Sequence, residues 1–222
     1  MSEKVLFTWS GGKDSALALY ELQKRDGCEV AALLTTLTED YDRISMHGVR
    51  SILLEKQAEC LGHPIEKVYL SKKSSNEEYE ASMREVLQKY LTFGVSSIVF
   101  GDIFLEDLRK YREDNLSKIG MKAVFPIWKR DTTELAHEFI DLGFRAVIIC
   151  VDSSFLDKTF VGRLFDRQLL SELPANVDPC GENGEFHPFV YDGPIFQKRV
   201  SYKKGGVNLR DDRFWNCDLI PI

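Results

Sequence analysis

Six consecutive residues near the N-terminus combine glycines, hydroxyls, an amine and a carboxylate. Residues 10–15 read Ser-Gly-Gly-Lys-Asp-Ser and follow the apolar run from Val5 to Trp9. The two glycines lack a Cβ atom, so they allow unusual φ angles and let a ligand lie against backbone N–H groups. A helix that begins here adds unsatisfied N–H groups and the positive end of its dipole. The segment therefore predicts a phosphate-binding loop between a strand and a helix.

Side chains of the same loop extend this prediction to a nucleotide and a metal. Lys13 adds a mobile cation, and the hydroxyls of Ser10 and Ser15 add hydrogen bonds. The P-loop pattern needs four residues between its glycines and Ser or Thr after the lysine, and this chain lacks both. Asp14 is a candidate ligand for magnesium, which prefers one or two carboxylates with phosphate oxygens and water. The alternative is an ordinary glycine turn, with Asp14 and Ser15 as helix caps.

A second polar cluster lies near the C-terminus. Residues 180–189 hold two carboxylates, an amide and an imidazole, and the candidates for chemistry are Glu182, Glu185 and His187. Such groups accept protons, bind metals or hold an amine, and the neighbouring glycines let the backbone fold tightly around a small substrate. A polar surface loop with a hairpin turn at residues 183–184 is the alternative.

Alternating apolar runs and helical patterns must position these two clusters. Strands are predicted at Val5 to Trp9, Glu29 to Leu37, Ile65 to Leu70, Ser96 to Ile103, Lys122 to Trp128 and Arg145 to Val151. Helices are predicted at Asp14 to Arg25, Arg50 to Leu61, Glu77 to Phe93, Glu106 to Ile119 and Thr132 to Leu142, most of them closed by a glycine. This order predicts an α/β fold with right-handed parallel crossovers and ligands at the carboxyl ends of the strands. The first strand should be central.

The pattern changes after Asp152, where periodicity weakens and several prolines interrupt a stretch rich in Gly, Asn and Asp. We therefore expect a Rossmann-like nucleotide domain over residues 1–125 and a smaller α+β substrate domain over residues 126–222.

Two positions at expected strand ends are further candidates for the nucleotide site. Thr35, near the carboxyl end of the second strand, is placed to meet adenine or ribose, although a β-branched residue is also ordinary in a strand. Gly101 and Asp102 follow the fourth strand on the ligand side of the sheet. Asp102 could hold magnesium or, alternatively, cap the next helix.

Composition narrows the class of protein. The 222 residues are 44% hydrophobic and 29% charged, which is typical of a globular protein. Five cysteines without a Cys-x-x-Cys spacing signal neither a disulfide framework nor a zinc site. The net charge of -6 argues against a broad nucleic-acid footprint. Neither a signal-peptide core nor an apolar run of about 18 residues occurs, so we expect a cytoplasmic protein without a membrane segment.

Both clusters resemble known motifs. The loop at residues 10–15 resembles the pyrophosphate loop of the N-type ATP pyrophosphatases, Ser-Gly-Gly-x-Asp-Ser. Residues 181–187, Gly-Glu-Asn-Gly-Glu-Phe-His, are similar to the C-terminal signature of the diphthine-ammonia ligase family. Companion motifs occur in order as Met46-His47-Gly48-Val49, Gly101-Asp102-Ile103, Pro126-Ile127-Trp128 and Val161-Gly162-Arg163. The resemblance thus spans nearly the whole chain. Pro188 stands where the family usually has Thr, which removes a hydroxyl and stiffens the loop.

The resemblance implies ATP-dependent amide formation. A carboxylate would attack the α-phosphate of ATP to form an acyl-adenylate, pyrophosphate would leave, and ammonia would displace AMP. In the family the carboxylate belongs to diphthine, a modified histidine on elongation factor 2, and the product is diphthamide.

The same resemblance suggests roles for the candidate residues. Lys13 would neutralise the departing pyrophosphate, and Asp14 or Asp102 would hold Mg²⁺. His47 would line the site, or it is simply an exposed loop histidine. Backbone groups that hold the pyrophosphate would come from Ser10, Gly11, Gly12 and Ser15. The proton acceptor for ammonium would come from Glu182, Glu185 and His187.

Three other hypotheses stay open at this point. The chain could adenylate another carboxylate or amide acceptor, it could modify tRNA, or it could be a nucleotide-binding sensor that has lost turnover. A tRNA enzyme would be supported by a basic stripe or a pair of reactive cysteines, and neither is visible in the sequence.

Overall fold

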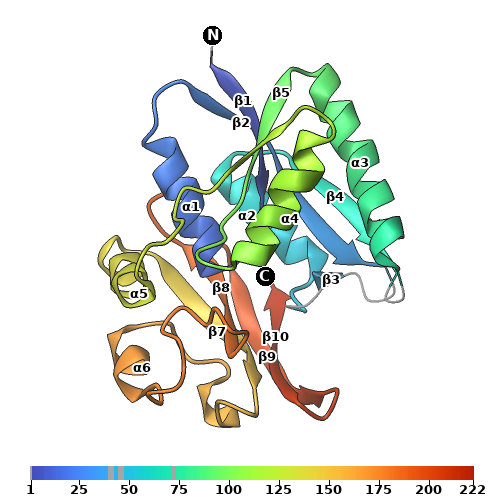
Figure 1. The fold of residues 1–222 in the computed structure, drawn as a ribbon. Coiled ribbons are helices and arrows are strands. Elements are labelled where there is room, and N and C mark those ends of the chain that lie inside the picture. Colours follow the sequence, from blue (N-terminus) through green and yellow to red (C-terminus); the bar gives the residue numbers. More distant parts are fainter. Residues whose placement is uncertain (1, 40–42, 45–47, 72–73) are drawn as a thin grey trace.

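A computed structural model describes residues 2–39, 43–44, 48–71 and 74–222 and contains two sheets joined by helices (Figure 1). The first sheet comprises β1 (Glu3–Thr8), β2 (Cys28–Thr38), β3 (Arg43–Ile44), β4 (Ile65–Leu70), β5 (Val95–Val99) and β6 (Lys122–Val124). The second comprises β7 (Arg145–Asp152), β8 (Phe186–Asp192), β9 (Tyr202–Arg210) and β10 (Phe214–Pro221). The predicted α/β class is confirmed.

The first sheet is parallel except for β3, and β1 lies at its centre as predicted. β1 pairs with β2 on one side and with β5 on the other, β4 extends the sheet from β2, and β6 extends it from β5. The short β3 runs antiparallel to the end of β2. The chain therefore leaves β1 in one direction and returns on its other side, and ligands bind at such a reversal at the carboxyl ends of the strands.

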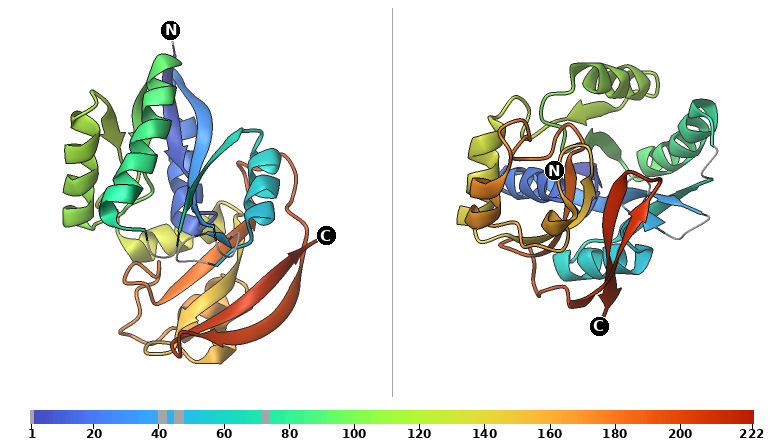
Figure 2. Two further views of the ribbon diagram at one scale, coloured as in Figure 1. Left: turned by 90° about the vertical axis from the view of Figure 1, so that its right-hand side faces the viewer. Right: turned by 90° about the horizontal axis from the view of Figure 1, so that it is seen from below.

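Alternating side chains of β1 pack against helices on both faces of this sheet. Val5 and Phe7 share a core with α1 (Lys13–Gln23) and α2 (Ser51–Leu61). Leu6 faces the other way, toward α3 (Asn76–Thr92) and α4 (Glu106–Ser117). The left-hand view of Figure 2 shows α3 and α4 on one side of the strands and α2 on the other. This two-residue alternation is what a strand buried on both faces requires.

The second sheet is antiparallel, with the order β8-β7-β10-β9. It is accompanied by α5 (Thr132–Asp141), a short 3-10 helix (Lys158–Phe160) and α6 (Arg167–Glu172). The expectation that the strand at Arg145 continues the parallel series was wrong, because β7 pairs antiparallel with both neighbours. Its continuous apolar run reflects burial, which is nearly complete along the strand, and does not report the direction of its partners.

Two predicted strands end earlier than their apolar runs. β5 stops at Val99 and β6 at Val124, although Ile103 and Ile127 beyond them are fully buried. These loop residues pack into the core shared with α5, so their apolar character does not reflect strand structure. Among the described residues, no helix has the length and apolar character needed to cross a bilayer.

Candidate functional site

The loop at residues 10–15 connects β1 to α1 at the carboxyl end of the central strand, where the sequence placed it. Gly11 has a φ of 75°, and a Cβ atom on it would approach the Gln57 side-chain oxygen to 2.7 Å. Gly12 is the N-cap residue of α1, and no side chain caps this helix end. The first N–H groups of α1 are therefore left for an anion, the arrangement that helix N-termini offer to phosphates.

Hydroxyl groups fix the shape of the loop. The Ser10 hydroxyl accepts a hydrogen bond from the Gly12 N–H at 3.2 Å, and its oxygen lies 3.1 Å from that of Ser15. The Ser15 hydroxyl donates to the Gly12 carbonyl at 2.9 Å. The alternative that Asp14 and Ser15 cap α1 does not hold, because both lie inside its first turn.

Gln57 of α2 supports the loop through hydrogen bonds and was not among the residues predicted from the sequence. Its side chain is fully buried, accepts a hydrogen bond from the Trp9 indole N–H at 2.9 Å, and donates to the carbonyls of Gly11 and Val190. An amide on the otherwise apolar face of a helix was the available signal, because buried polar groups need partners. Gln57 thus joins the loop to α2 and to β8.

Lys13 is fully buried and forms an ion pair with Asp14. Burial alone would lower the pKa of this amine, but the charge of Asp14, with Cys180 and Glu182 nearby, raises it well above its ordinary value. Lys13 is therefore a permanent cation at the start of α1.

Glu182 lies close enough to Lys13 and Asp14 to interact with their charges. Burial raises the pKa of Glu182 to about 8, and the charges of Asp14, Asp178 and Asp102 act in the same direction, while Lys13 opposes them. A carboxyl group with such a pKa exchanges its proton near neutral pH, as a general base requires.

Cys180 lies beside Lys13 but is not activated by it. Burial raises the pKa of this thiol to about 12, although Lys13 opposes the rise, and the thiol donates to the Thr132 carbonyl at 3.1 Å. Because the thiolate is the reactive form of cysteine, this residue is not suited to nucleophilic chemistry.

Glu185 shapes the segment that carries Glu182. It is fully buried, and its carboxylate accepts hydrogen bonds from the backbone N–H groups of Asp178 and Asn183 at 2.9 Å and from the Asn183 side chain at 3.0 Å. Both oxygens are thus occupied. The surface-loop alternative therefore fails for Glu185, which is part of the interior, although Asn183 is exposed and residues 181–184 form a turn.

β8 brings the second cluster against the first. The Pro188 carbonyl lies 3.3 Å from where a Cβ atom on Gly12 would be, and the Val190 N–H donates to the Gly11 carbonyl at 2.9 Å. His187, just before them, is partly buried and pairs with Cys150 of β7. The structure therefore joins residues 180–190 and the glycine loop in one site.

The register of β7 shifts next to Pro188. β8 pairs His187 with Cys150 and Pro188 with Ile148, so Ile149 is left out of the register. A proline has no N–H to donate to a sheet ladder and is accommodated at such irregularities.

Thr35 and Gly101 border the loop on its two sides. Thr35 is buried on β2, directly after Leu34, which pairs with Thr8 at the end of β1. A Cβ atom on Gly101 would lie 3.0 Å from the Ser15 backbone nitrogen, so only glycine lets the end of β5 approach α1 this closely.

Asp102 forms an ion pair with Arg112 of α4, with 2.7 Å between Oδ2 and Nε. Burial raises the pKa of Asp102, and Asp14 adds to this effect while Arg112 opposes it. The alternative role as a helix cap is wrong, since Leu105 is the N-cap residue of α4 and no side chain caps it.

The carboxylates near the loop do not form a metal site of protein ligands alone. In the part of the chain that the structure describes, no group of three or more His, Cys, Asp or Glu side chains is arranged to hold a metal. Asp14 and Asp102 each face a cationic partner. One carboxylate beside phosphate oxygens is nevertheless a normal setting for magnesium. His47, the other candidate for this site, lies outside the described residues.

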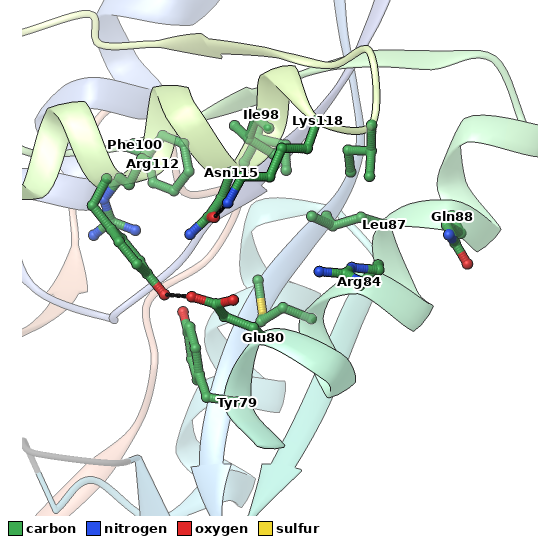
Figure 3. A pocket seen from close by; sticks show the side chains of 14 residues that line it. Tyr79, Glu80, Arg84, Leu87, Gln88, Ile98, Phe100, Arg112, Asn115 and Lys118 are labelled. Atoms are coloured by element: carbon green, nitrogen blue, oxygen red, sulfur yellow. Dashed lines mark hydrogen bonds between the residues drawn. The ribbon is translucent and has the colours of Figure 1, made fainter. Parts of the chain in front are cut away.

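A hollow of about 440 Å³ lies away from the loop, between α3 and α4 (Figure 3). Leu87, Ile98 and Phe100 contribute to its apolar floor, and a hydrogen bond from Tyr111 to Glu80 crosses between the two helices. No residue of the glycine loop lines it, so the chemistry of the site and this hollow are separate features.

Comparison with known proteins assigns the chain to a family. Residues 3–123 match the model of the diphthamide synthase N-terminal domain, and residues 131–219 match that of the diphthamide synthase C-terminal domain. The diphthine-ammonia ligase of Schizosaccharomyces pombe is 27% identical over 217 residues, which cover 89% of this chain and 36% of that protein. The one from Danio rerio is 26% identical over 86% of this chain and 83% of its own length. The one from Homo sapiens is 32% identical over 112 residues, 48% of this chain and 42% of that protein. The chain thus spans little more than a third of the yeast relative and most of the fish relative. With both domain models matched in order, the chain belongs to the diphthamide synthase family.

Proposed function

We propose that this protein is an ATP-dependent ligase that joins ammonia to the carboxylate of diphthine. One observation supports the proposal most directly: β8 docks the signature segment against the glycine loop, so a phosphate-binding element and a titratable carboxyl group lie close together. Family membership and the names of the relatives support the choice of diphthine and ammonia as substrates.

The loop offers hydrogen-bond donors and a positive charge to the phosphates of ATP. The uncapped N-terminus of α1 and the glycine backbone offer N–H donors, and the buried Lys13 adds a fixed positive charge. We propose that these groups hold the β- and γ-phosphates, so that pyrophosphate is a stabilised leaving group. ATP would supply the adenylyl group that makes a carboxylate reactive toward ammonia. Thr35 would contact the adenine or ribose.

Magnesium would enter with the nucleotide. We propose Asp14 as its protein ligand, because Asp14 lies beside the phosphate position at the start of α1 and a single carboxylate suffices there. Asp102 forms an ion pair with Arg112, so we propose that it does not bind the metal. Its negative charge would instead act on Asp14 and Glu182 nearby.

Glu182 is our candidate for the proton acceptor of the ammonium ion. With a pKa of about 8 its ionised form, which accepts the proton, becomes abundant as pH rises toward 8, and the surrounding carboxylates favour a small cation. Glu185 would position this residue through its bonds to Asp178 and Asn183, while His187 stays a candidate at the pocket's edge.

The two sheets suggest separate binding roles for the two halves of the chain. We propose that residues 1–125 bind the nucleotide and that residues 126–222 bind the acceptor, elongation factor 2, in the cytoplasm. The reaction would take place where β8 meets the loop.

Product analysis tests the proposal. Purified protein is incubated with ATP, magnesium and ammonium, together with elongation factor that is either unmodified or carries diphthine. AMP that forms only with the diphthine-bearing factor, and not with the Lys13→Ala variant, would support it. ADP would refute the cleavage chemistry, and AMP formed with another acceptor would refute the assignment of diphthine.

A further inference from the structure

A second and larger cleft, of about 770 Å³, opens between the two sheets. One wall consists of the carboxyl ends of β2 and β4, at Thr38 and Leu70, and of the start of α3. The opposite wall is the β9–β10 hairpin, with Arg210 and Phe214 on its two strands. Both halves of the chain thus contribute to this cleft, at the end of the sheet where α/β proteins bind ligands.

One strand pairing connects the proposed reaction site with the cleft. Cys150 of β7 lines it and pairs with His187 of β8, and directly paired residues of neighbouring strands point to the same face of a sheet. His187 precedes Pro188, whose carbonyl approaches Gly12 of the loop. From the loop side, Thr38 lies three residues beyond Thr35 on β2, or about 10 Å at 3.3 Å per residue.

Two arginines, Arg43 and Arg210, and one carboxylate, Asp211, line this cleft. Arg43 donates to Asp218 at 3.1 Å, and Asp218 is also bound by Arg50. Arg210 is exposed and lies over the backbone of Gly48, where a Cβ atom would be 3.0 Å from its Nη1. Within the described parts of the chain, Arg210 has no carboxylate in ion-pair distance. A guanidinium so placed is suited to bind a carboxylate from outside.

The hairpin that presents Arg210 ends in a tight turn with two residues at positive φ. Asp211 and Asp212 have φ angles of 49° and 50°, in the left-handed region, and the turn closes with a hydrogen bond from Arg213 to Arg210 at 3.0 Å. Arg213 is in turn held by both of its side-chain bonds to Asp152 of β7. Asp is among the residues that adopt positive φ in such hairpin turns, so the turn fixes where Arg210 leaves β9.

We propose that this cleft holds the polypeptide segment that flanks the reacting side chain of the acceptor protein, and that Arg210 binds an acidic side chain of that segment. This inference rests on the proposed function, in which the acceptor is a protein. A segment seated here would have to extend its modified side chain by about 10 Å along β2 to reach the loop. Arg210 thereby acts on acceptor binding and makes no contact with ATP.

The test compares Arg210→Gln with Lys203→Gln. Lys203 lies on the same hairpin and is exposed, but it does not line the cleft, so the control removes the same charge elsewhere. We expect Arg210→Gln to raise the KM for diphthine-bearing elongation factor at least tenfold and to leave the KM for ATP unchanged. Lys203→Gln should change neither constant by more than about twofold. Arg210→Lys, which keeps the charge, should recover part of the loss.

Direct binding keeps the two proposals apart. The affinities of the wild-type protein and of all three variants for the factor are measured without ATP, at low and at high salt. Weaker binding of Arg210→Gln, with a reduced dependence on salt, supports the cleft even if no AMP forms. Unchanged binding by a folded Arg210→Gln variant overturns it, and so does tighter binding of tRNA than of the factor.

Discussion

Replacing Glu182 with glutamine should change how stability depends on pH. The pKa of Glu182 is about 8 in the folded protein, compared with an ordinary value of 4.5. At pH values between these two pKa values the folded state binds more protons than the unfolded state, so the free energy of unfolding falls as pH rises. The difference of about 3.5 pH units sets an upper bound of about 5 kcal/mol on this loss.

Urea unfolding at pH 5 and at pH 8 measures this effect. Glu182→Gln cannot ionise, so its free energy of unfolding should fall less than that of the wild type over this range. Glu85→Gln, which changes an exposed side chain of α3, is the matched control and should follow the wild type. Identical slopes for Glu182→Gln and the wild type would show that Glu182 is not in the environment described.

The same variant tests the proposed role in catalysis. With a pKa of about 8, the ionised fraction of Glu182 grows about fivefold from pH 7 to pH 8. Free ammonia also becomes more abundant over this range, so the quantity to follow is the ratio of wild-type to Glu182→Gln turnover. This ratio should rise severalfold between pH 7 and pH 8. A constant ratio would refute Glu182 as the proton acceptor.

Three further substitutions probe the loop. Gly101→Ala places a Cβ atom 3.0 Å from a backbone nitrogen of α1 and should lower the free energy of unfolding in urea by about 1–3 kcal/mol. Gly206→Ala is the control: its Cβ atom meets nothing closer than 3.7 Å, and it should lower this free energy by less than about 0.5 kcal/mol. Gln57→Leu leaves a buried indole N–H without its partner and should lower the free energy of unfolding by about 1–3 kcal/mol, so an unchanged urea midpoint would refute the brace. Lys13→Ala should reduce ATP turnover about 100-fold or more in the product assay, and a rate within about twofold of the wild type would remove Lys13 from its role.

The first sheet could be predicted because its local signals agree. β4 has the predicted bounds, and α2 differs from its prediction by one residue at its start. Gly62, in the left-handed region at the end of α2, provides the stop signal that the sequence indicated. Strands buried on both faces and helices with glycine ends leave little room for another assignment.

The second sheet gave weaker signals for a physical reason. β9 is an edge strand with most of its side chains exposed, so its residues show no alternation between apolar and polar types. Two adjacent glycines interrupt it further. β8 begins with the last two residues of the signature, and its proline argues against a strand unless the bulge in its partner is known.

The candidate site was predictable in its residue types and less so in their contacts. The glycine loop follows from a local pattern, but the ion pair of Asp102 with Arg112 depends on where α4 packs. The burial of Glu185 and the brace by Gln57 likewise arise from tertiary contacts, which a single sequence does not encode locally.

A crystal structure with an ATP analogue that cannot be cleaved between its α- and β-phosphates tests the central claim most directly. The account predicts that the β- and γ-phosphates accept hydrogen bonds from the backbone N–H groups of residues 11–15, with Lys13 beside them. A nucleotide bound elsewhere, for example in the hollow between α3 and α4, with the loop unoccupied, would contradict it.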